Sequence, residues 1–419
     1  MTYQRPLSTI ERYYVSCDSI KEGKHYTPCI IQMVIEGDAS IDVEALRRAT
    51  TKASYANPGS RVKLKGHLGF SRWVDSEHST PVRVIENDWN GLSNAEAEFL
   101  QDPLPVRKGP TSEVLIIINK VLNKSFVIIR SHHGAMDGRG TLHFSNDVFR
   151  CLRGELPVGE NNNITDMELA KSINHNAQPS FLAPDVSAPT GQPINISDDE
   201  KRQTSRWVRR SLHGKHKGVL AKVALEIAHY TRLKGEQNVR FQIPVDMRFH
   251  KAGLHSTANL TGGIVVTVDI DTNSEQWNQN IKSQLADKKE TEIPRFFRFF
   301  PFHFLNWIPR KIIHNSNNRL VKKRRIQGQF RTTGILSNLG LLKLEQFSGK
   351  GFNAQKCYFV PPEFDTTALF VTLAGHPEGV EILIRAPTEL DGGRIEKLLD
   401  FIIDNIEHKE SFEEQAVSA

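Results

Sequence analysis

The sequence predicts a mixed α/β fold arranged as two lobes, and three observations support this. Short apolar runs typical of buried strands alternate with stretches whose apolar residues recur at helical spacing. The 419 residues are enough for two or three folding units. Near the middle, residues 176–204 carry Pro179, Pro184, Pro189 and Pro193 among small polar residues, which is typical of a linker. We therefore expect one lobe over 1–175 and the other over 205–419.

The first lobe is predicted to contain both strands and helices. Asp42 can cap a helix in which Val43, Leu46 and Ala49 recur on one face. A second helix should end at Gly154, since glycine favours helix C-termini. The predicted helices cover 42–53 and 141–153, and the predicted strands cover 27–37, 113–119 and 125–130.

The second lobe repeats this mixture. A helix over 216–232 has an apolar stripe, and a last amphipathic helix over 394–408 follows Gly392. The polar residues 411–419 are expected to form a frayed tail. The predicted strands of this lobe cover 239–245, 264–270, 334–339, 367–374 and 380–386.

Composition and charge exclude several classes of protein. Lys plus Arg exceed Asp plus Glu by 54 − 48 = 6, but residues 294–331 alone contain ten cations and no acid. The remainder is slightly acidic, so we expect no nucleic-acid partner. The four cysteines, Cys17, Cys29, Cys151 and Cys357, form no CxxC, which argues against a disulfide framework or a cysteine zinc site. The start of the sequence has no apolar signal core, and no apolar run is long enough to span a membrane, so we expect a cytoplasmic protein.

One stretch points to chemistry. His132 and His133 begin His-His-Gly-Ala-Met-Asp-Gly, which follows a predicted strand and precedes a predicted helix. A neutral imidazole is the side chain best suited to accept a proton near pH 7. Because adjacent residues leaving a strand point in different directions, the two histidines should have different roles. Asp137 could fix the turn by pairing with a cation or backbone amides, or it could orient the imidazole as in a hydrolase triad.

Two other interpretations of this stretch stay open at this point. It could be a histidine-bearing surface turn with no chemistry. It could also bind a metal ion, but adjacent histidines and one Asp lack a clear third or fourth ligand, so we expect no metal.

The stretch fits HHxxxDG and resembles the signature of the condensation-domain acyltransferase superfamily. That group includes peptide-synthetase condensation domains and alcohol acetyltransferases, and chloramphenicol acetyltransferase is a shorter relative. Four further patches resemble the same group and occur in its order along the chain. They are Arg5-Pro6-Leu7-Ser8 with Glu11-Arg12, residues 41–49, Ile243-Pro244-Val245-Asp246-Met247-Arg248, and Ser337-Asn338-Leu339-Gly340.

The resemblance implies two chloramphenicol-acetyltransferase-like lobes with the active site in a tunnel between them. His133 would be the general base, and His132 would help to hold the loop. Asp137 would form an ion pair with a second-lobe arginine, here Arg248. Gly138 would leave room for the turn. Asn338 or Ser337 could donate a hydrogen bond to an oxyanion.

The implied activity is acyl transfer from a thioester to a hydroxyl or amine acceptor, a reaction common in secondary metabolism. Acyl-CoA is the favoured donor and a hydroxyl the favoured acceptor, since the patches look most like the stand-alone alcohol-acylating members. No cofactor is implied beyond this thioester co-substrate. The alternatives are a peptide-synthetase-type condensation enzyme that uses an acyl carrier protein as donor, and an inactive binding protein with the same fold.

The segment 294–310 is rich in phenylalanine and arginine and continues into the basic stretch up to residue 331. It could form helices whose aromatic face packs into the second lobe. It could instead contact a membrane surface or a long acyl chain. A third possibility is a docking site for an acidic carrier protein or for the phosphates of CoA.

Overall fold

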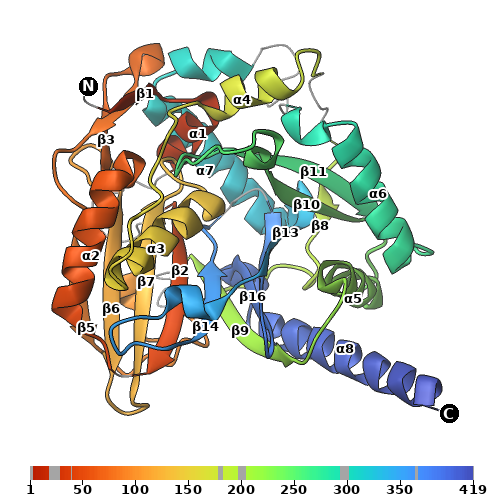
Figure 1. The fold of residues 1–419 in the computed structure, drawn as a ribbon. Coiled ribbons are helices and arrows are strands. Elements are labelled where there is room, and N and C mark those ends of the chain that lie inside the picture. Colours follow the sequence, from red (N-terminus) through yellow and green to blue (C-terminus); the bar gives the residue numbers. More distant parts are fainter. Residues whose placement is uncertain are drawn as a thin grey trace.

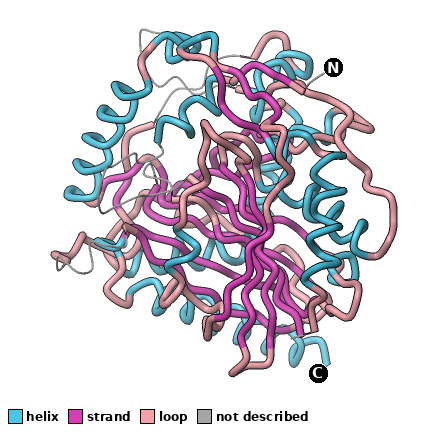
Figure 2. Tube along the Cα trace, turned by 90° about the vertical axis from the view of Figure 1, so that its left-hand side faces the viewer, coloured by secondary structure: helices cyan, strands magenta, loops and turns pink. Residues whose placement is uncertain are grey.

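The computed structural model describes residues 3–17, 29–38, 40–177, 183–196, 204–292, 302–363 and 367–418. Two lobes face each other, each built around its own sheet (Figure 1). The strands lie at the centre and most helices lie outside them (Figure 2). The predicted two-lobed α/β fold is confirmed.

The sheet of the first lobe has five strands in the order β14-β2-β7-β6-β5. Its strands are β14 (Ala354–Val360), β2 (Ile30–Asp38), β7 (Lys124–His132), β6 (Ser112–Asn119) and β5 (Val82–Glu86). Neighbours run antiparallel except β5 and β6. Helices α2 (Val43–Ala56) and α3 (Gly138–Leu152) pack together beside this sheet, and Asp42 caps α2 by accepting a 2.8 Å hydrogen bond from the Ala45 amide. A small sheet of β1 (Gln4–Pro6), β4 (Arg72–Asp75) and β3 (Val62–Lys65) completes the lobe.

The sheet of the second lobe has six strands in the order β11-β10-β13-β15-β16-β9. Its strands are β11 (Thr261–Val268), β10 (Val239–Asp246), β13 (Thr332–Leu341), β15 (Thr367–His376), β16 (Gly379–Pro387) and β9 (Ser205–His213). Helices α5 (Val219–Leu233), α6 (Ser274–Ala286) and α8 (Arg394–Ser418) flank it. The expected frayed tail over 411–418 is wrong, because α8 continues to Ser418.

Strand β14 connects the two lobes. It belongs by sequence to the second lobe, yet it pairs antiparallel with β2 of the first. The physical reason is apolar burial, since Cys357 and Phe359 join the core of the first lobe. Of the expected linker, residues 178–182 and 197–203 lie outside the described residues. Its described part includes β8 (Val186–Ser187), which pairs with β12 (Gln329–Phe330).

The aromatic and basic segment also crosses between lobes. Residues 294–301 lie outside the described residues, and the rest forms the short helix η7 (Phe302–Trp307) and the helix α7 (Arg310–Gln327). Both pack on α1 (Thr9–Cys17) of the first lobe. Arg12 of α1 donates to the carbonyls of Leu305 and Ile308 at 3.0 and 2.7 Å. In the described part, the segment around Leu305 thus packs on the first lobe and not on the second, whereas the end of α7 reaches the second lobe through Arg325, which pairs with Glu389 at 3.4 Å.

A buried ion cluster joins the lobes on the side of β9. The Arg209 guanidinium donates to Glu36 of β2 at 3.1 Å and to Glu381 of β16 at 2.5 Å, and it stacks on the Tyr358 ring at 4.2 Å. Burial acts to raise the pKa of Glu381, but a hydrogen bond from His376 and the charge of Arg209 bring it down to about 2. The cluster thus depends on an ionised Glu381 carboxylate.

We expect Arg209→Met to destabilise the protein by about 3 kcal/mol, because it leaves two buried carboxylates without their shared cation. Urea denaturation measures this loss. Arg210→Met is the matched control, since Arg210 is part-exposed and pairs with the exposed Asp400, and it should cost about 0.5 kcal/mol or less. Since the folded pKa of Glu381 lies below its ordinary value, the stability from this group is present above about pH 4.5 and is lost as pH falls toward 2. Equal losses for the two variants would contradict this account.

Candidate functional site

The HHxxxDG stretch forms the turn between β7 and α3. His132 is the last residue of β7, and Asp137 caps α3 by accepting a 2.7 Å hydrogen bond from the Gly140 amide. The His133 amide donates to the Cys29 carbonyl at 2.7 Å, which ties the turn to the start of β2. The turn therefore places His133 at the end of a buried sheet, where its backbone is fixed on both sides.

The His133 ring has a defined tautomer. Its Nδ1 lies 3.1 Å from the Met136 carbonyl oxygen. A carbonyl oxygen only accepts hydrogen bonds, so Nδ1 carries the proton and Nε2 carries the lone pair. The ring stacks on Tyr14 with centroids 4.2 Å apart. Burial lowers the pKa of His133 to about 4, against the opposing effect of the Met136 carbonyl, so the imidazole is neutral at physiological pH.

His132 has a different environment, as the alternation of the strand predicts. Its side chain is fully buried, and Nδ1 accepts a 3.0 Å hydrogen bond from the Gly134 amide. It holds the turn from within. Its part in catalysis stays a prediction.

Asp137 connects the turn to the second lobe. Both oxygens of its carboxylate accept from Arg248 at 3.1 Å, and one of them also accepts from the Leu260 amide at 2.7 Å and the Thr261 hydroxyl at 2.8 Å. Burial acts to raise the pKa of Asp137, but Arg248 and the backbone amides bring it below its ordinary value. The ion pair that the resemblance implied is present. Since Nδ1 of His133 faces Met136 instead, the alternative of an Asp–His triad is wrong.

The glycines of the turn differ from expectation. A Cβ at Gly138 would meet Phe359 and Leu339 at 3.9 and 4.0 Å, which are ordinary contacts, so Gly138 is not needed to make room. The crowded position is Gly140, where a Cβ would lie 2.0 Å from the Thr257 carbonyl oxygen. Close packing of α3 against the second lobe thus depends on Gly140.

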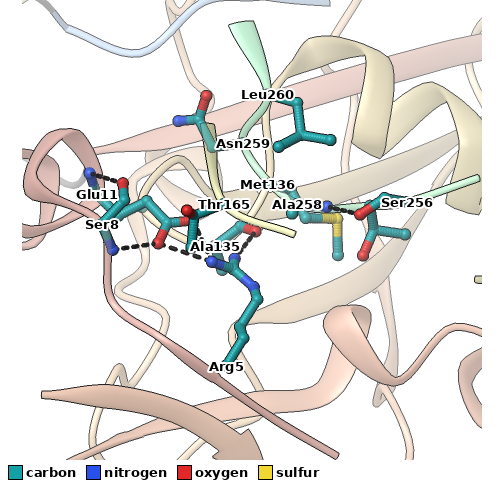
Figure 3. A network of polar contacts seen from close by, with 12 residues as sticks. Arg5, Ser8, Glu11, Ala135, Met136, Thr165, Ser256, Ala258, Asn259 and Leu260 are labelled. Carbon is teal, nitrogen blue, oxygen red and sulfur yellow. Dashed lines mark hydrogen bonds and ion pairs between the residues drawn. The ribbon is translucent and has the colours of Figure 1, made fainter. Parts of the chain in front are cut away.

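Several residues that support the site were not predicted from the sequence. Asn259 is buried and donates to the His133 carbonyl at 2.9 Å. Arg5 donates to the Ala135 carbonyl at 3.2 Å and pairs with Glu11 at 2.6 Å, so the N-terminal segment braces the turn from the other side (Figure 3). The sequence pointed to Arg5 only through the family resemblance of the patch that contains it. It gave no indication of Asn259, because no local pattern predicts a hydrogen bond to a distant turn.

A cavity of about 470 Å³ lies between the lobes, where the resemblance implied a tunnel. His133, Tyr14 and Gly138 line it from the first lobe. Ser337 and Asn338 of β13 line it from the second, and the Asn338 amide oxygen accepts from the Gly340 amide at 2.9 Å. The amide nitrogen of Asn338 is thus its remaining donor. The residues that the structure describes include no cluster of three or more His, Cys, Asp or Glu suited to a metal ion.

Solved structures of other proteins resemble this two-lobed fold. The first condensation domain of the calcium-dependent antibiotic synthetase, bound to a substrate analogue, superposes with a TM-score of 0.61 at 12% identity over 96% of both chains. The chain has the condensation-domain fold. The starter condensation domain of rhizomide synthetase in complex with C8-CoA gives 0.58 at 14% identity over 96% of this chain and 94% of that one. Polyketide synthase associated protein 5 from Mycobacterium tuberculosis gives 0.59 at 13% identity over 95% and 96%. No protein-family model and no curated protein matches the chain.

We expect Asp137→Asn to lower the free energy of unfolding by about 3 kcal/mol, since it leaves the buried Arg248 without its main counter-charge. Chemical denaturation measures the loss. Asp246→Asn is the control, because Asp246 also pairs with Arg248, at 2.7 Å, but its side chain is 27% exposed. It should cost about 1 kcal/mol or less. A larger loss for the Asp246 variant would show that Asp137 does not anchor the turn.

Proposed function

We propose that this protein is an acyltransferase that moves an acyl group from a thioester donor to a hydroxyl or amine acceptor, with His133 as general base. The observation that carries the proposal is that His133 lines a cavity shared by the two lobes, with Nδ1 3.1 Å from the Met136 carbonyl oxygen, an arrangement that leaves Nε2 as the proton acceptor of the ring. Acyl-CoA is the favoured donor, and the rhizomide starter domain, which shares the fold, was solved with C8-CoA bound. A hydroxyl is the favoured acceptor.

In this reaction Nε2 of His133 accepts the proton of the acceptor as its oxygen or nitrogen attacks the thioester carbonyl carbon. The new bond forms while the carbonyl oxygen becomes an oxyanion. The amide of Asn338 or the hydroxyl of Ser337 would donate to that oxyanion. The tetrahedral intermediate then expels the thiolate, which takes the proton from His133. The imidazole returns to its starting state, and no further cofactor takes part.

A carrier-protein-bound donor is the second candidate, since several proteins with this fold are condensation domains of peptide synthetases. Such an enzyme would use the same imidazole and differ only in the thiol that leaves. A binding protein without turnover is the third.

Contact with a membrane surface remains a prediction from the sequence. In the described part of the basic segment, Trp307 and Ile312 are more than half exposed, at 55% each. No helix among the described residues is long and apolar enough to cross a bilayer. A cytoplasmic location likewise remains a prediction.

We expect His133→Ala to lower the rate of acceptor-dependent thiol release from acyl-CoA by about 10²–10⁴-fold, which is the usual contribution of a general base. Release is followed with a thiol reagent, and products are identified by mass. His143→Ala is the control, because His143 lies on α3, the helix that follows the motif turn, but outside the cavity lining. Identical release by wild type and the His133 variant would disprove acyl-CoA-dependent catalysis. Acceptor-dependent consumption of an acylated carrier protein alone would identify the second candidate.

The pH profile offers a separate test. Since the pKa of His133 in the folded protein is about 4, its imidazole stays unprotonated at pH values well below the ordinary pKa of 6.5. We expect kcat/KM to stay level from pH 7 to about pH 5 and to fall only nearer pH 4. An acid limb near 6.5 would contradict the assigned state. The same shift makes folding less stable as pH falls from 6.5 toward 4, because only the unfolded state takes up the proton there, so circular dichroism at each pH is the control.

A further inference from the structure

Two aromatic side chains that lie far apart in the sequence meet at the surface of the protein. Phe70 is the last residue of the short helix η2 (Leu68–Phe70), at the tip of the β3–β4 hairpin, and is 70% exposed. Trp307 ends η7, is 55% exposed, and meets the Phe70 ring edge to face with centroids 5.7 Å apart. Phe304, three residues earlier on the same face of this 3-10 helix, is also exposed. Grouped exposed rings of this kind are typical of a surface that binds a partner or a membrane.

A buried arginine holds both tips from behind. Arg12 is 2% exposed and donates to the Leu305 carbonyl of η7 at 3.0 Å and to the Leu68 carbonyl of η2 at 3.1 Å. Gly69 lies so close to the indole of Trp307 that a Cβ there would be 2.9 Å from the ring. The two tips are therefore fixed relative to each other before anything binds to them.

The chain around these rings carries cations and no acid. Residues 62–74, 103–112 and 302–331 contain no Asp or Glu. These segments are neighbours, since the Leu64 amide donates to the Val106 carbonyl at 2.7 Å and η2 packs on η7. Four of their exposed cations form no ion pair with any described carboxylate; they are Lys65, Arg72, Arg107 and Lys311.

Two of these cations lie opposite each other. Lys65 of β3 and Arg72 of β4 are direct cross-strand partners in the hairpin, so their side chains lie on the same face, where like charges lower stability. Arg107 adds a third charge nearby, since its guanidinium donates to the Gly66 carbonyl at 3.4 Å. Lys311 lies in the first turn of α7, shortly after η7. An anionic surface would relieve the repulsion, and the exposed rings would leave water at the same time.

This combination favours a bilayer that contains anionic lipids over a protein partner. Aromatic rings are favoured at the level of the lipid headgroups, and each cation near an anionic leaflet adds attraction. A protein partner needs carboxylates at matching fixed positions. A bilayer needs only rings and cations on one face, because its headgroups diffuse laterally to the charges. Three separate segments meet that simpler requirement here.

We propose that this aromatic and basic surface binds an anionic lipid bilayer, with its rings in the interfacial layer. The surface comprises two rings and four cations, namely Phe70, Trp307, Lys65, Arg72, Arg107 and Lys311. None of these residues lines the cavity, so the inference does not depend on the proposed function.

The surface lies beside the cavity through α1. Ile10 and Tyr13 of α1 line the cavity, and both also pack against Leu305 of η7 and Ile313 of α7. A bilayer bound at the rings would therefore lie next to one wall of the cavity.

Tryptophan fluorescence tests the inference directly. The protein has five tryptophans, and four of them are at most 2% exposed, namely Trp73, Trp89, Trp207 and Trp277. Trp307 is thus the indole that a bilayer can reach. We expect vesicles of phosphatidylcholine with about 30% phosphatidylserine to shift its emission to the blue, and brominated lipid in them to quench it, whereas phosphatidylcholine alone should have little effect. Raising the salt from about 0.1 M to about 1 M should release most of the protein, because the Debye length falls from about 10 Å to about 3 Å.

Sedimentation with the same vesicles assigns the binding to residues. Phe70→Ser should lower the partition coefficient about tenfold, the low end for an aromatic side chain that no longer leaves water. Lys65→Gln combined with Arg72→Gln should lower it about 30-fold, since each cation near an anionic leaflet contributes about fivefold. Trp307→Phe should keep most of the binding and lose the fluorescence shift.

Matched controls remove the same groups elsewhere. Tyr55→Ser removes a ring that is 60% exposed on α2, and Lys215→Gln combined with Lys217→Gln removes two exposed cations of the second lobe. Each should bind within about twofold of wild type, because neither side chain set belongs to the surface. Thermal unfolding shows whether each variant is folded.

Three outcomes would overturn the inference. The first is that anionic vesicles at low salt neither sediment the protein nor shift its emission. The second is an equal loss for the hairpin variants and the controls, which would indicate attraction by net charge alone. The third is binding of an acidic acyl carrier protein, abolished by Phe70→Ser, without binding of vesicles, which would identify a protein partner. Acyl transfer is measured without vesicles and stands or falls separately.

Discussion

The arrangement of this protein depends on the carboxylate of Asp137, which the motif turn places at the junction of the two lobes. It caps α3 of the first lobe and accepts from Arg248, Leu260 and Thr261 of the second. A carboxylate with so many donors stays ionised even when buried, and it fixes the turn relative to both sheets at once. The contacts of Asp137 with the second lobe also determine the position of the cavity, because they fix how the two sheets lie relative to each other.

The state of His133 follows from that constraint. With Asp137 facing the second lobe, the hydrogen-bond partner of Nδ1 is the Met136 carbonyl, which fixes the tautomer without adding a negative charge. The imidazole is therefore neutral but weakly basic, with a pKa of about 4. A triad carboxylate beside Nδ1 would have raised that pKa and made a stronger base. In the proposed reaction, placement of the acceptor would then contribute as much as proton transfer.

The sequence predicts the elements of the fold well, because strands such as β2 and β7 and helices such as α2 have strong local patterns. It does not predict that β14 joins the sheet of the first lobe or that α7 packs on α1. Both depend on contacts between segments far apart in the chain, and an apolar strand shows no preference for one sheet over another. The same holds within the site. The motif located the turn, whereas Asn259 and Gly140 acquire their roles only when the second lobe closes on it.

The weak basicity of His133 bears on the proposed reaction. A weak base works best when the acceptor hydroxyl is held at hydrogen-bond distance, since its contribution then comes from geometry and not from proton affinity. The position of the His133 imidazole is fixed from the second lobe, since Asn259 donates to the His133 carbonyl and Arg248 holds Asp137 of the same turn. In the proposed reaction His133 would therefore contribute mainly through its position.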